Sequence, residues 1–432
     1  MKAVAAWGRL TQGLHHTMAL QERLQVPSQI RNNLPGLAHG AGRSYGDVGL
    51  NENGQLWMTT GLDKLIRFDA EQGILDCEAG VLLKDIQDTF VPRGWMLAVT
   101  PGTQWVTAGG AVANDVHGKN HHRQGSFGDH VLGIQLARTD GQCLQLQPQD
   151  PLFRATLGGL GLTGVILTVR IRLQKVPGPW LQTHSKPFHG LDDFFAMAQK
   201  ADAEWEYTVA WIDCLAKGEP RGIFMCANHA PAADHGPAPK IRPRRNLPLT
   251  PPFSLVNTAS LKLFNEVYFR LNARRSGTHM LDYRAFFYPL DNLQNWNRMY
   301  GPAGFFQHQC VLPPSTSREG LKALLAEISA SNEGSFLAVL KTFGDRRSAG
   351  LLGFPRPGVT LALDFPNRGA RTRALLHRLD AVVQSCGGTL YLAKDASMSR
   401  DFFESAYPEH AEFSTFRDPG ISSEMSRRFW GV

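Results

Sequence analysis

The fold is decided by residues 101–131, here called the central segment, which read PGTQWVTAGGAVANDVHGKNHHRQGSFGDHV. The central segment contains six glycines and four histidines, and almost no apolar run in it is long enough to form a helix or a core strand. Closely spaced glycines let a backbone approach a ligand and adopt positive φ angles. Long loops inside compact domains are usually functional. We therefore expect the central segment to wrap a bound cofactor.

The composition is that of a soluble globular protein with two or three domains. The chain has 432 residues, of which 43% are hydrophobic and 19% are charged, and this length allows a sizeable core. No apolar run approaches the roughly 18 residues of a membrane-spanning helix, and the N-terminal apolar patch is too short for a secretory signal. The six cysteines are scattered without a CxxC pair. This pattern argues against a zinc site or a disulfide framework and indicates a cytoplasmic location.

The chain is basic, with a formal net charge of +7, and its cationic residues cluster at 240–245 and 274–275. Such clusters are usually solvated surface, although they would also suit phosphate groups or an anionic membrane face. Nucleic acid is a poorer match, because no aromatic residues are interleaved with the cations and no binding motif is present. We expect no nucleic-acid partner and leave a peripheral contact with the inner face of the plasma membrane open.

Hydrophobic periodicity divides the chain into two parts of α+β type. In the first part, residues 1–178, we expect a helix at 83–90 and strands at 56–60, 74–79, 95–100, 131–137, 143–146 and 165–173. Composition changes near 175–180. In the second part, residues 179–388, we expect helices at 191–201, 318–331 and 371–385 and strands at 207–213, 305–312, 336–343 and 360–365. A proline-rich insert at about 227–252 is expected to be mobile, and residues 389–432 form a helix-rich C-terminal segment.

Familiar motifs do not account for the glycines and histidines. Gly159, Gly161 and Gly164 match G-x-G-x-x-G, but a β-branched strand follows them where a Rossmann nucleotide site requires a helix. His117 and His121 have zinc-like spacing, but nearby glycines disfavour a helix, so we expect no metal. Neither a G-x-S-x-G elbow nor a P-loop occurs. The central segment and residues 38–47, here called the first glycine loop, together suit a diphosphate-bearing cofactor held by backbone N–H groups.

Several motifs together resemble a known family. They are AHGAGRSYGD at 38–47, HGKNHH and GSFGDHV in the central segment, GLTGVI at 161–166, FFYPLDN at 286–292, QHQ at 307–309, FP at 354–355 and YLAKD at 391–395. In this combination the chain resembles the vanillyl-alcohol-oxidase type of FAD enzymes and, more narrowly, the decaprenylphosphoryl-β-D-ribose 2-oxidase family. The similarity covers nearly the whole chain.

The resemblance implies a two-domain PCMH-type FAD-binding fold of the α+β class. The FAD-binding domain would span 1–178, and a separate α+β substrate domain built on an antiparallel sheet would span 179–388. The C-terminal segment, 389–432, would return to the FAD-binding domain. The FAD would lie between the two glycine-rich loops and face the substrate domain.

The resemblance also implies which residues hold each ligand. The implied FAD contacts are Gly40, Gly42, Arg43, Ser44, Tyr45, Gly46, Asp47, Gly110, Asn114, His117, Ser126, Gly128, His130, Ile166 and Tyr391. The implied substrate contacts are Lys119, Gln307, Gln309, Lys341 and Lys394, with Tyr45 and His117 beside them. Lys394, His117 and Tyr45 are the candidate catalytic residues. By residue type alone, Lys341 and Lys394 would be strand-edge lysines with solvated ends, and the resemblance reverses that interpretation.

These residue types suit the oxidation of a sugar hydroxyl. Hydride transfer from a sugar C–H to flavin requires that the hydroxyl proton is removed while the carbon is held in line. Lys394 or His117 could take that proton. Lys394 could do so only if burial near other cations lowers its pKa. Lysines around the site would also bind a phosphate-linked sugar.

Two departures from the family pattern refine the expectation. Related oxidases that tether FAD often use a histidine in the first glycine loop, where this chain has Arg43, so we expect non-covalent FAD. The best-known family members carry Asn and Cys where this chain has Thr360 and Ala362. The resemblance therefore leaves the identity of the substrate and the length of its prenyl carrier open.

The leading hypothesis is an FAD-dependent oxidase of the C2 hydroxyl of a polyprenylphosphoryl pentose. An NAD(P)-dependent short-chain reductase would complete an epimerisation that serves cell-wall polysaccharide biosynthesis. The runner-up is a soluble alditol or aldonolactone oxidase that uses O₂. A third hypothesis, a flavin-free binding protein on a decayed fold, is weaker because both loops and both lysines are intact.

Overall fold

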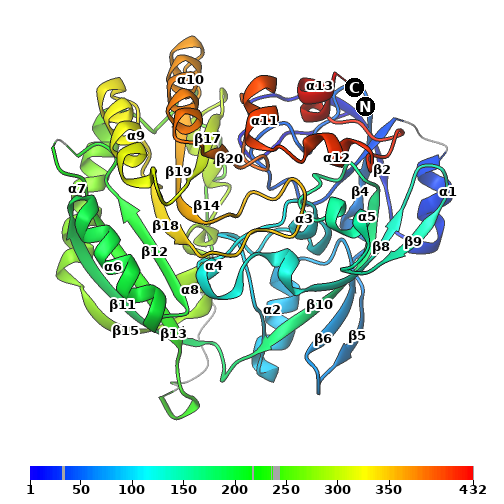
Figure 1. Ribbon diagram of the computed structural model, residues 1–432, viewed down its shortest axis with the longest axis horizontal. Helices are drawn as coiled ribbons and strands as arrows, with labels where there is room; N and C mark the ends of the chain where they lie inside the picture. The colour runs from blue at the N-terminus through cyan, green and yellow to red at the C-terminus, as the bar shows by residue number, and fades with distance from the viewer. Residues whose placement is uncertain (32–34, 217, 235, 237–243, 432) are drawn as a thin grey trace.

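The computed structural model describes residues 1–31, 35–216, 218–234, 236 and 244–431. Three sheets organise these residues (Figure 1). The helices and strands are α+β in character, as the sequence predicts. The first two sheets use residues up to Lys175, and the third begins at Trp180, which is close to the predicted domain boundary at 178.

The first two sheets build the part of the molecule that carries both glycine-rich loops. One has the order β1-β2-β4-β3, formed by Lys2–Ala3, Leu14–Ala19, Gln55–Met58 and Gly36–His39. The other has the order β5-β6-β10-β8-β9, formed by Leu65–Asp69, Ile74–Glu78, Val165–Lys175, Val131–Ala137 and Cys143–Leu146, with β7 (Trp95–Leu97) also paired to β10. Their helices are α1 (Val26–Arg31), α2 (Leu83–Phe90), α3 (Ala108–Ala113), α4 (His121–Gln124) and α5 (Pro151–Thr156).

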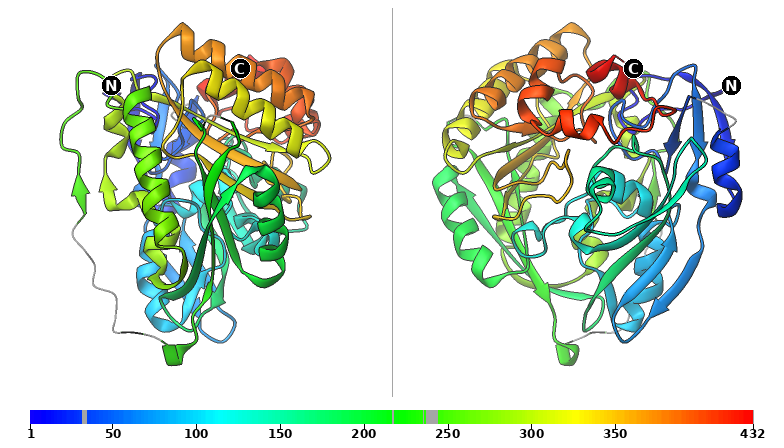
Figure 2. Two further views of the ribbon diagram at one scale, coloured as in Figure 1. Left: turned by 90° about the vertical axis from the view of Figure 1, so that its left-hand side faces the viewer. Right: turned by 45° about the vertical axis from the view of Figure 1, so that its right-hand side comes forward.

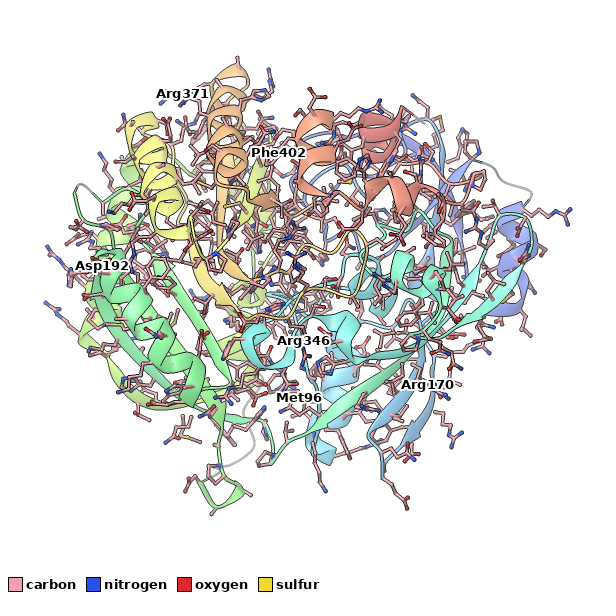
Figure 3. The ribbon with its side chains drawn as sticks, viewed as in Figure 1. Met96, Arg170, Asp192, Arg346, Arg371 and Phe402 are labelled. Carbon is pink, nitrogen blue, oxygen red and sulfur yellow. The ribbon has the colours of Figure 1, made fainter. Side chains whose placement is uncertain are left out.

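Opposite charges stabilise the outer face of the second sheet. Arg170 of β10 lies directly across from Asp76 of β6 and donates two hydrogen bonds to its carboxylate, at 2.7 and 2.9 Å (Figure 3). The inner face packs α2 and α3 against apolar side chains such as Leu75, Val169 and Ile171. This alternation of apolar and polar side chains is the normal pattern of a half-exposed antiparallel sheet.

The third sheet is antiparallel throughout and has eight strands in the order β15-β11-β13-β12-β18-β19-β17-β20. Its strands are Gly277–Asp282, Trp180–His189, Arg221–His229, Tyr207–Ile212, Val339–Phe343, Gly358–Pro366, Phe305–Leu312 and Thr389–Leu390. The accompanying helices are α6 (Gly190–Glu204), α7 (Thr258–Arg274), α8 (Tyr283–Phe287), α9 (Ser317–Ser331) and α10 (Ala370–Ser385). A small separate pair joins β14 (Arg245–Asn246) to β16 (Leu293–Gln294).

Helices α6 and α7 cover opposite faces of the third sheet. On β13, Phe224 packs in the cluster that contains Phe194 of α6. The preceding residue, Ile223, packs with Phe269 of α7. Successive side chains of a strand point to opposite faces, so the two helices sandwich this end of the sheet.

The C-terminal segment packs on the first part of the chain. Its helices are α11 (Arg400–Ala406), α12 (His410–Ser414) and α13 (Glu424–Trp430). Ile421 forms a parallel bridge with Gly36 beside β3, and the Asp418 carboxylate accepts a hydrogen bond of 2.8 Å from the Thr139 N–H. Figure 1 and the right panel of Figure 2 show these helices beside the N-terminal segment.

The structure corrects two details of the sequence analysis. The central segment is not entirely loop, because Thr107 caps the short helix α3 by accepting a hydrogen bond of 3.1 Å from the Gly110 N–H. The insert expected from residue 227 begins later, because β13 continues to His229 and pairs with β11 and β12. Part of this insert, residues 237–243, lies outside the described residues, and with it residues 240–243 of the basic cluster.

Candidate active site

A cavity of about 620 Å³ lies where the first glycine loop, the central segment and the third sheet meet. This volume falls in the usual range for small-molecule and cofactor sites. Its walls come from both parts of the chain, and Tyr391 and Lys394, just after β20, close one side. The cavity therefore forms only when the third sheet packs against the part of the chain that carries the two glycine-rich loops.

The first glycine loop presents its backbone to the cavity directly after β3. The backbone N–H groups of residues 41–44 form no hydrogen bond with another described residue. Gly42 has a φ of 63°, and a Cβ at Gly46 would lie 1.6 Å from the Asp395 carbonyl oxygen, so both positions require glycine. Because neighbouring free N–H groups form an anion-binding concavity, this loop suits a diphosphate.

The central segment supplies the opposite wall through Gly110, Asn114 and His117. The Tyr391 hydroxyl donates a hydrogen bond of 2.8 Å to the Asn114 carbonyl oxygen, which ties this wall to the third sheet. Gly161 and Ile166 line the cavity from the turn before β10 and from β10 itself. Strand β10 follows the G-x-G-x-x-G glycines, as predicted, and a Rossmann arrangement is thereby excluded.

Three neighbouring strands of the third sheet form the polar wall. The lining residues are Gln307 and Gln309 of β17, Val339 and Lys341 of β18, and Thr360 and Ala362 of β19. In the sheet register Gln309 lies opposite Ala362, and Ala362 lies opposite Val339. Because alternate residues share a face, the antiparallel pairing is what brings these six side chains together.

His117 is the centre of a buried hydrogen-bond network. The Lys341 Nζ lies 2.8 Å from its Nδ1, and the Gln309 amide nitrogen lies 2.9 Å from its Nε2. Burial, followed by the charge of Lys341, lowers the pKa of His117 well below its usual value. Which ring nitrogen of His117 carries the hydrogen depends on the tautomer. The Gln309 amide nitrogen also donates a hydrogen bond of 3.3 Å to the Thr360 hydroxyl, and the Lys341 Nζ donates one to the Gly118 carbonyl oxygen.

Lys394 faces Tyr45 across the cavity. The Lys394 Nζ lies 3.7 Å from the centroid of the Tyr45 ring and forms no hydrogen bond with another described residue. Burial lowers the pKa of Lys394 to about 7, and the charge of the Asp364 carboxylate opposes that shift. Burial raises the pKa of Tyr45 well above its usual value. At neutral pH, Lys394 is therefore partly an uncharged amine that can accept a proton.

Asp364 stands behind these two residues. Its carboxylate accepts a hydrogen bond of 2.7 Å from the Gln307 amide, and burial raises its pKa to about 7. After burial, the charge of Asp364 also raises the pKa of Tyr45. Asp364 therefore acts electrostatically on both Tyr45 and Lys394.

Two further lysines bring positive charge to the same cavity. The Lys119 Nζ donates a hydrogen bond to the Phe286 carbonyl oxygen and lies 4.5 Å from the centroid of the Phe286 ring. Burial lowers the pKa of Lys119 to about 7. Burial, followed by the charges of Lys119 and Lys394, lowers the pKa of Lys341 well below its usual value. A bound anion would relieve this mutual repulsion, so the site favours a negatively charged ligand.

The structure gathers most of the residues named from the sequence around this cavity. Gly40, Gly42, Arg43, Ser44, Tyr45, Gly46, Gly110, Asn114, His117, Lys119, Ile166, Gln307, Gln309, Lys341, Tyr391 and Lys394 all line it.

Four residues named from the sequence as FAD contacts do not line the cavity: Asp47, Ser126, Gly128 and His130. Asp47 accepts two hydrogen bonds of 2.9 Å from Arg428 of α13. The other three form hydrogen bonds within the central segment, with Asp129, Asp115 and Gln124. These four residues hold the two loops in shape.

The sequence analysis missed several residues of the site. Trp7, Trp211, Tyr268 and Asp291 line the cavity, and Asp364 supports it. Asp364 could have been found, because it lies two residues beyond Ala362 on a predicted strand and therefore shares its face. Trp7 and Tyr268 come from segments where no element was predicted, so no sequence pattern pointed to them.

The donors and shape of the cavity fit FAD. The Arg43 Nε, the Asn114 Oδ1 and the Gln307 Oε1 are buried without a hydrogen-bond partner among the described residues. Together with the free N–H groups of residues 41–44, they offer both donors and acceptors to a polar cofactor. Gly161, at a φ of 76°, leaves open space where a side chain would project. A large group with a diphosphate can therefore lie against these backbones.

The described residues form neither a metal-ligand cluster nor a membrane-spanning helix. They contain no group of three or more His, Cys, Asp or Glu side chains placed to hold a metal ion. Within the same residues, no helix has the length and apolar character needed to cross a membrane.

Comparison with known proteins agrees with this geometry. A family model for the FAD binding domain matches residues 19–147. Decaprenylphosphoryl-beta-D-ribose oxidase of Mycolicibacterium smegmatis is 34% identical over 416 residues, which are 91% of this chain and 88% of that protein. A Streptomyces coelicolor protein described as the uncharacterized protein in mprA 5'region is 33% identical over 81% of this chain and 99% of its own length. L-gulonolactone oxidase of Bos taurus is 29% identical over about a third of each chain. The chain is thus an FAD-dependent oxidoreductase that acts on a hydroxyl group, and it belongs to the decaprenylphosphoryl-β-D-ribose oxidase family.

Proposed function

We propose that the protein oxidises the C2 hydroxyl of a polyprenylphosphoryl pentose to the 2-keto sugar. FAD bound between the two glycine-rich loops supplies the hydride acceptor, its N5 atom. The observation that carries the proposal is Lys394, a half-buried amine on the cavity wall that lies 3.7 Å from the centroid of the Tyr45 ring and has no hydrogen-bond partner among the described residues. The pKa of this amine is lowered to about 7. Such an amine is suited to take a hydroxyl proton.

The other polar residues orient the sugar. His117 is fixed by Lys341 and by Gln309, so its position depends little on solvent. Gln307 is fixed by Asp364. These pre-oriented groups can hold the C2 carbon in line with the flavin at little entropic cost. Tyr45, with its raised pKa, stays protonated and can donate a hydrogen bond to the substrate.

Lys119 and Lys341 would hold a phosphate on the substrate, while Lys394 serves as the base. Lys119, Lys341 and Lys394 line one cavity, and no carboxylate lies within ion-pair distance of any of the three among the described residues. A sugar phosphate would supply that counter-charge. Thr360 and Ala362, which depart from the family pattern, lie on the same wall as Lys341. They are the positions where this chain would differ in its choice of pentose.

The match to L-gulonolactone oxidase covers only a third of this chain, so the runner-up, a soluble alditol or aldonolactone oxidase, has weaker support. The keto product would need a reductase to complete an epimerisation, and we propose an NAD(P)-dependent short-chain enzyme as the partner. We also propose that FAD is not covalently attached, because Arg43 occupies the usual position of the tethering histidine and stacks 4.3 Å above Trp7.

The test compares substrates in flavin reduction without oxygen. The purified protein is mixed with a polyprenylphosphoryl ribose, with the same sugar phosphate lacking the prenyl chain, and with an alditol. We expect the prenylated sugar to bleach the flavin absorbance fastest. Fast bleaching by the alditol alone would support the runner-up. Acid precipitation should leave the flavin in the supernatant, and flavin in the pellet would contradict non-covalent binding.

A further inference from the structure

Helix α7 has an unusual exposed face. Nine of the fourteen exposed large apolar side chains in the described part of the chain lie between Leu249 and Leu281. Monomeric soluble proteins rarely gather so many in one region without a function. Helix α7 runs along the side of the molecule at the left of Figure 1, which faces the viewer in the left panel of Figure 2.

Helix α7 has a buried face and an exposed apolar face. Leu261, Asn265 and Phe269, spaced four residues apart, are buried. On another face lie Leu263, Phe264, Val267 and Leu271, here called the α7 stripe, with exposed fractions between 41% and 68%. Positions four residues apart share one face of a helix, so Leu263, Val267 and Leu271 form one continuous apolar row toward solvent.

Positive charges flank the α7 stripe. Arg270, Arg274 and Arg275 are exposed beside it at the C-terminal end of the helix. Glu266, the acidic residue of this helix, is held by Arg221 at 2.6 Å and is also paired with Arg270. An exposed apolar row bordered by arginines is typical of helices that lie in the interface of an anionic membrane.

The α7 stripe is continuous with the active-site cavity. The ring of Phe264 stacks on that of Tyr268, with centroids 5.5 Å apart. Tyr268 in turn contacts Trp211, with centroids 4.7 Å apart, and both residues line the cavity. Val209 and Met225 extend the apolar lining from there. A chain of ring contacts therefore leads from the exposed face of α7 to the wall of the cavity that also holds the lysines.

We propose that the α7 stripe docks on the surface of an anionic phospholipid bilayer. Through Phe264 and Tyr268, this places the cavity where a prenyl chain can pass from the membrane toward the flavin. The passage of the prenyl chain rests on the proposed function, whereas the docking does not. A second copy of the chain is a poorer occupant, because the acidic residue of α7, Glu266, is already paired with Arg221 and Arg270, which leaves α7 of a second copy no acidic side chain for Arg274 and Arg275.

The docking is tested by sedimentation of the FAD-loaded protein with vesicles. Vesicles of phosphatidylcholine containing phosphatidylglycerol should bind the wild type, and vesicles of phosphatidylcholine alone should bind it less. The variant L263Q/V267Q/L271Q should lower the partition coefficient by at least about tenfold. The control variant L65Q/I66Q, at two exposed apolar positions of β5, should bind like the wild type. Unchanged binding by the stripe variant would overturn the proposal. A stripe-dependent dimer without vesicle binding would overturn it in favour of a second copy.

Activity separates this proposal from the proposed function. The stripe variant should oxidise a short-chain, water-soluble sugar phosphate as fast as the wild type and a vesicle-embedded polyprenyl substrate more slowly. Equal rates on both substrates for the variant and the wild type would contradict the passage of the prenyl chain along α7. A wild type that binds anionic vesicles but oxidises neither substrate would refute the proposed function and leave the docking intact.

Discussion

Burial gives the amines of this site their chemistry. Lys394 and Lys119 both have a pKa lowered to about 7, although an exposed lysine has a pKa near 10.4. Two neighbouring lysines with different contacts can serve different roles. Lys119 is held by the Phe286 carbonyl oxygen, whereas the Lys394 Nζ has no such partner among the described residues. Lys394 is therefore the better base and Lys119 the better anchor.

The first prediction concerns Lys394 and pH. The active form of Lys394 is the neutral amine, so kcat/KM should rise as pH increases toward about 7. At higher pH kcat/KM should fall again, because Lys119, the phosphate anchor, has a pKa of about 7 and loses its charge. Lys394→Met should retain FAD and lower the rate of flavin reduction by about 10²- to 10⁴-fold. Stopped-flow absorbance across pH measures both effects. The exposed Lys322→Met serves as the control, and a Lys394→Met enzyme with normal reduction would exclude Lys394 as the base.

The second prediction concerns Asp364, which acts through Lys394. The Asp364 carboxylate raises the pKa of Lys394 against the effect of burial. Removing that charge in Asp364→Asn should therefore move the rising limb of the kcat/KM profile to lower pH. The isosteric amide keeps the contact with Gln307. If Asp364 had only a structural role, the rising limb of the kcat/KM profile would therefore stay at the same pH. A limb that stays at its wild-type pH would show that Asp364 does not tune the base.

At the scale of elements, hydrophobic pattern predicted the strongly periodic segments and missed those that depend on contacts. The predicted helix at 83–90 is confirmed as α2, and the predicted strands at 131–137 and 143–146 are confirmed as β8 and β9. Helix α7 was missed because its apolar residues occupy both a buried and an exposed face, which blurs the helical period. Helix α3 was missed because its glycines have low helix propensity and its first turn depends on the Thr107 cap.

The third prediction concerns Gly161 in the turn before β10. A valine there would project into the cavity and would also strain a backbone with a φ of 76°. A clash of about 1–3 kcal/mol would weaken FAD binding by about 5- to 150-fold. Titration of the apoprotein with FAD measures this change. Gly431→Ala, at the same φ but away from the cavity, should bind FAD normally. Equal FAD affinity in both variants would contradict the placement of Gly161 against the bound FAD.

The fourth prediction concerns Arg428, which joins α13 to the first glycine loop. Arg428 pairs with Asp47 at 2.9 Å and with Asp395 at 2.8 Å. Arg428→Ala would leave one buried carboxylate, Asp395, and one half-buried carboxylate, Asp47, without their partner and should lower the free energy of unfolding by about 3–5 kcal/mol. Urea denaturation of the FAD-loaded protein measures the loss. Arg400→Ala, at an exposed ion pair, is the matched control. If Arg428→Ala lowered the free energy of unfolding by less than about 1 kcal/mol, the range of a surface pair, the pairing of Arg428 with Asp47 and Asp395 would not be needed for stability.

At the scale of the whole molecule, the site exists because distant segments meet. Most of the site residues named in advance from the first glycine loop, the central segment and residues 391–395 line the cavity. Trp7 and Tyr268 could not be named, because each reaches the cavity through packing between elements far apart in sequence. Asp364 could have been named from strand alternation, because it lies two residues beyond Ala362, and the register places it opposite Gln307. Sequence identifies residues with unusual local chemistry, and tertiary pairing decides which ordinary ones join them.

The central claim is that this cavity oxidises a lipid-linked pentose with FAD. Its most direct test is the flavin absorbance of the purified protein after anaerobic addition of a polyprenylphosphoryl ribose. We expect rapid bleaching of the flavin absorbance that requires Lys394 and yields one equivalent of a 2-keto sugar. Flavin that stays oxidised with this substrate, while an unphosphorylated alditol bleaches it, would contradict the oxidation of a lipid-linked pentose.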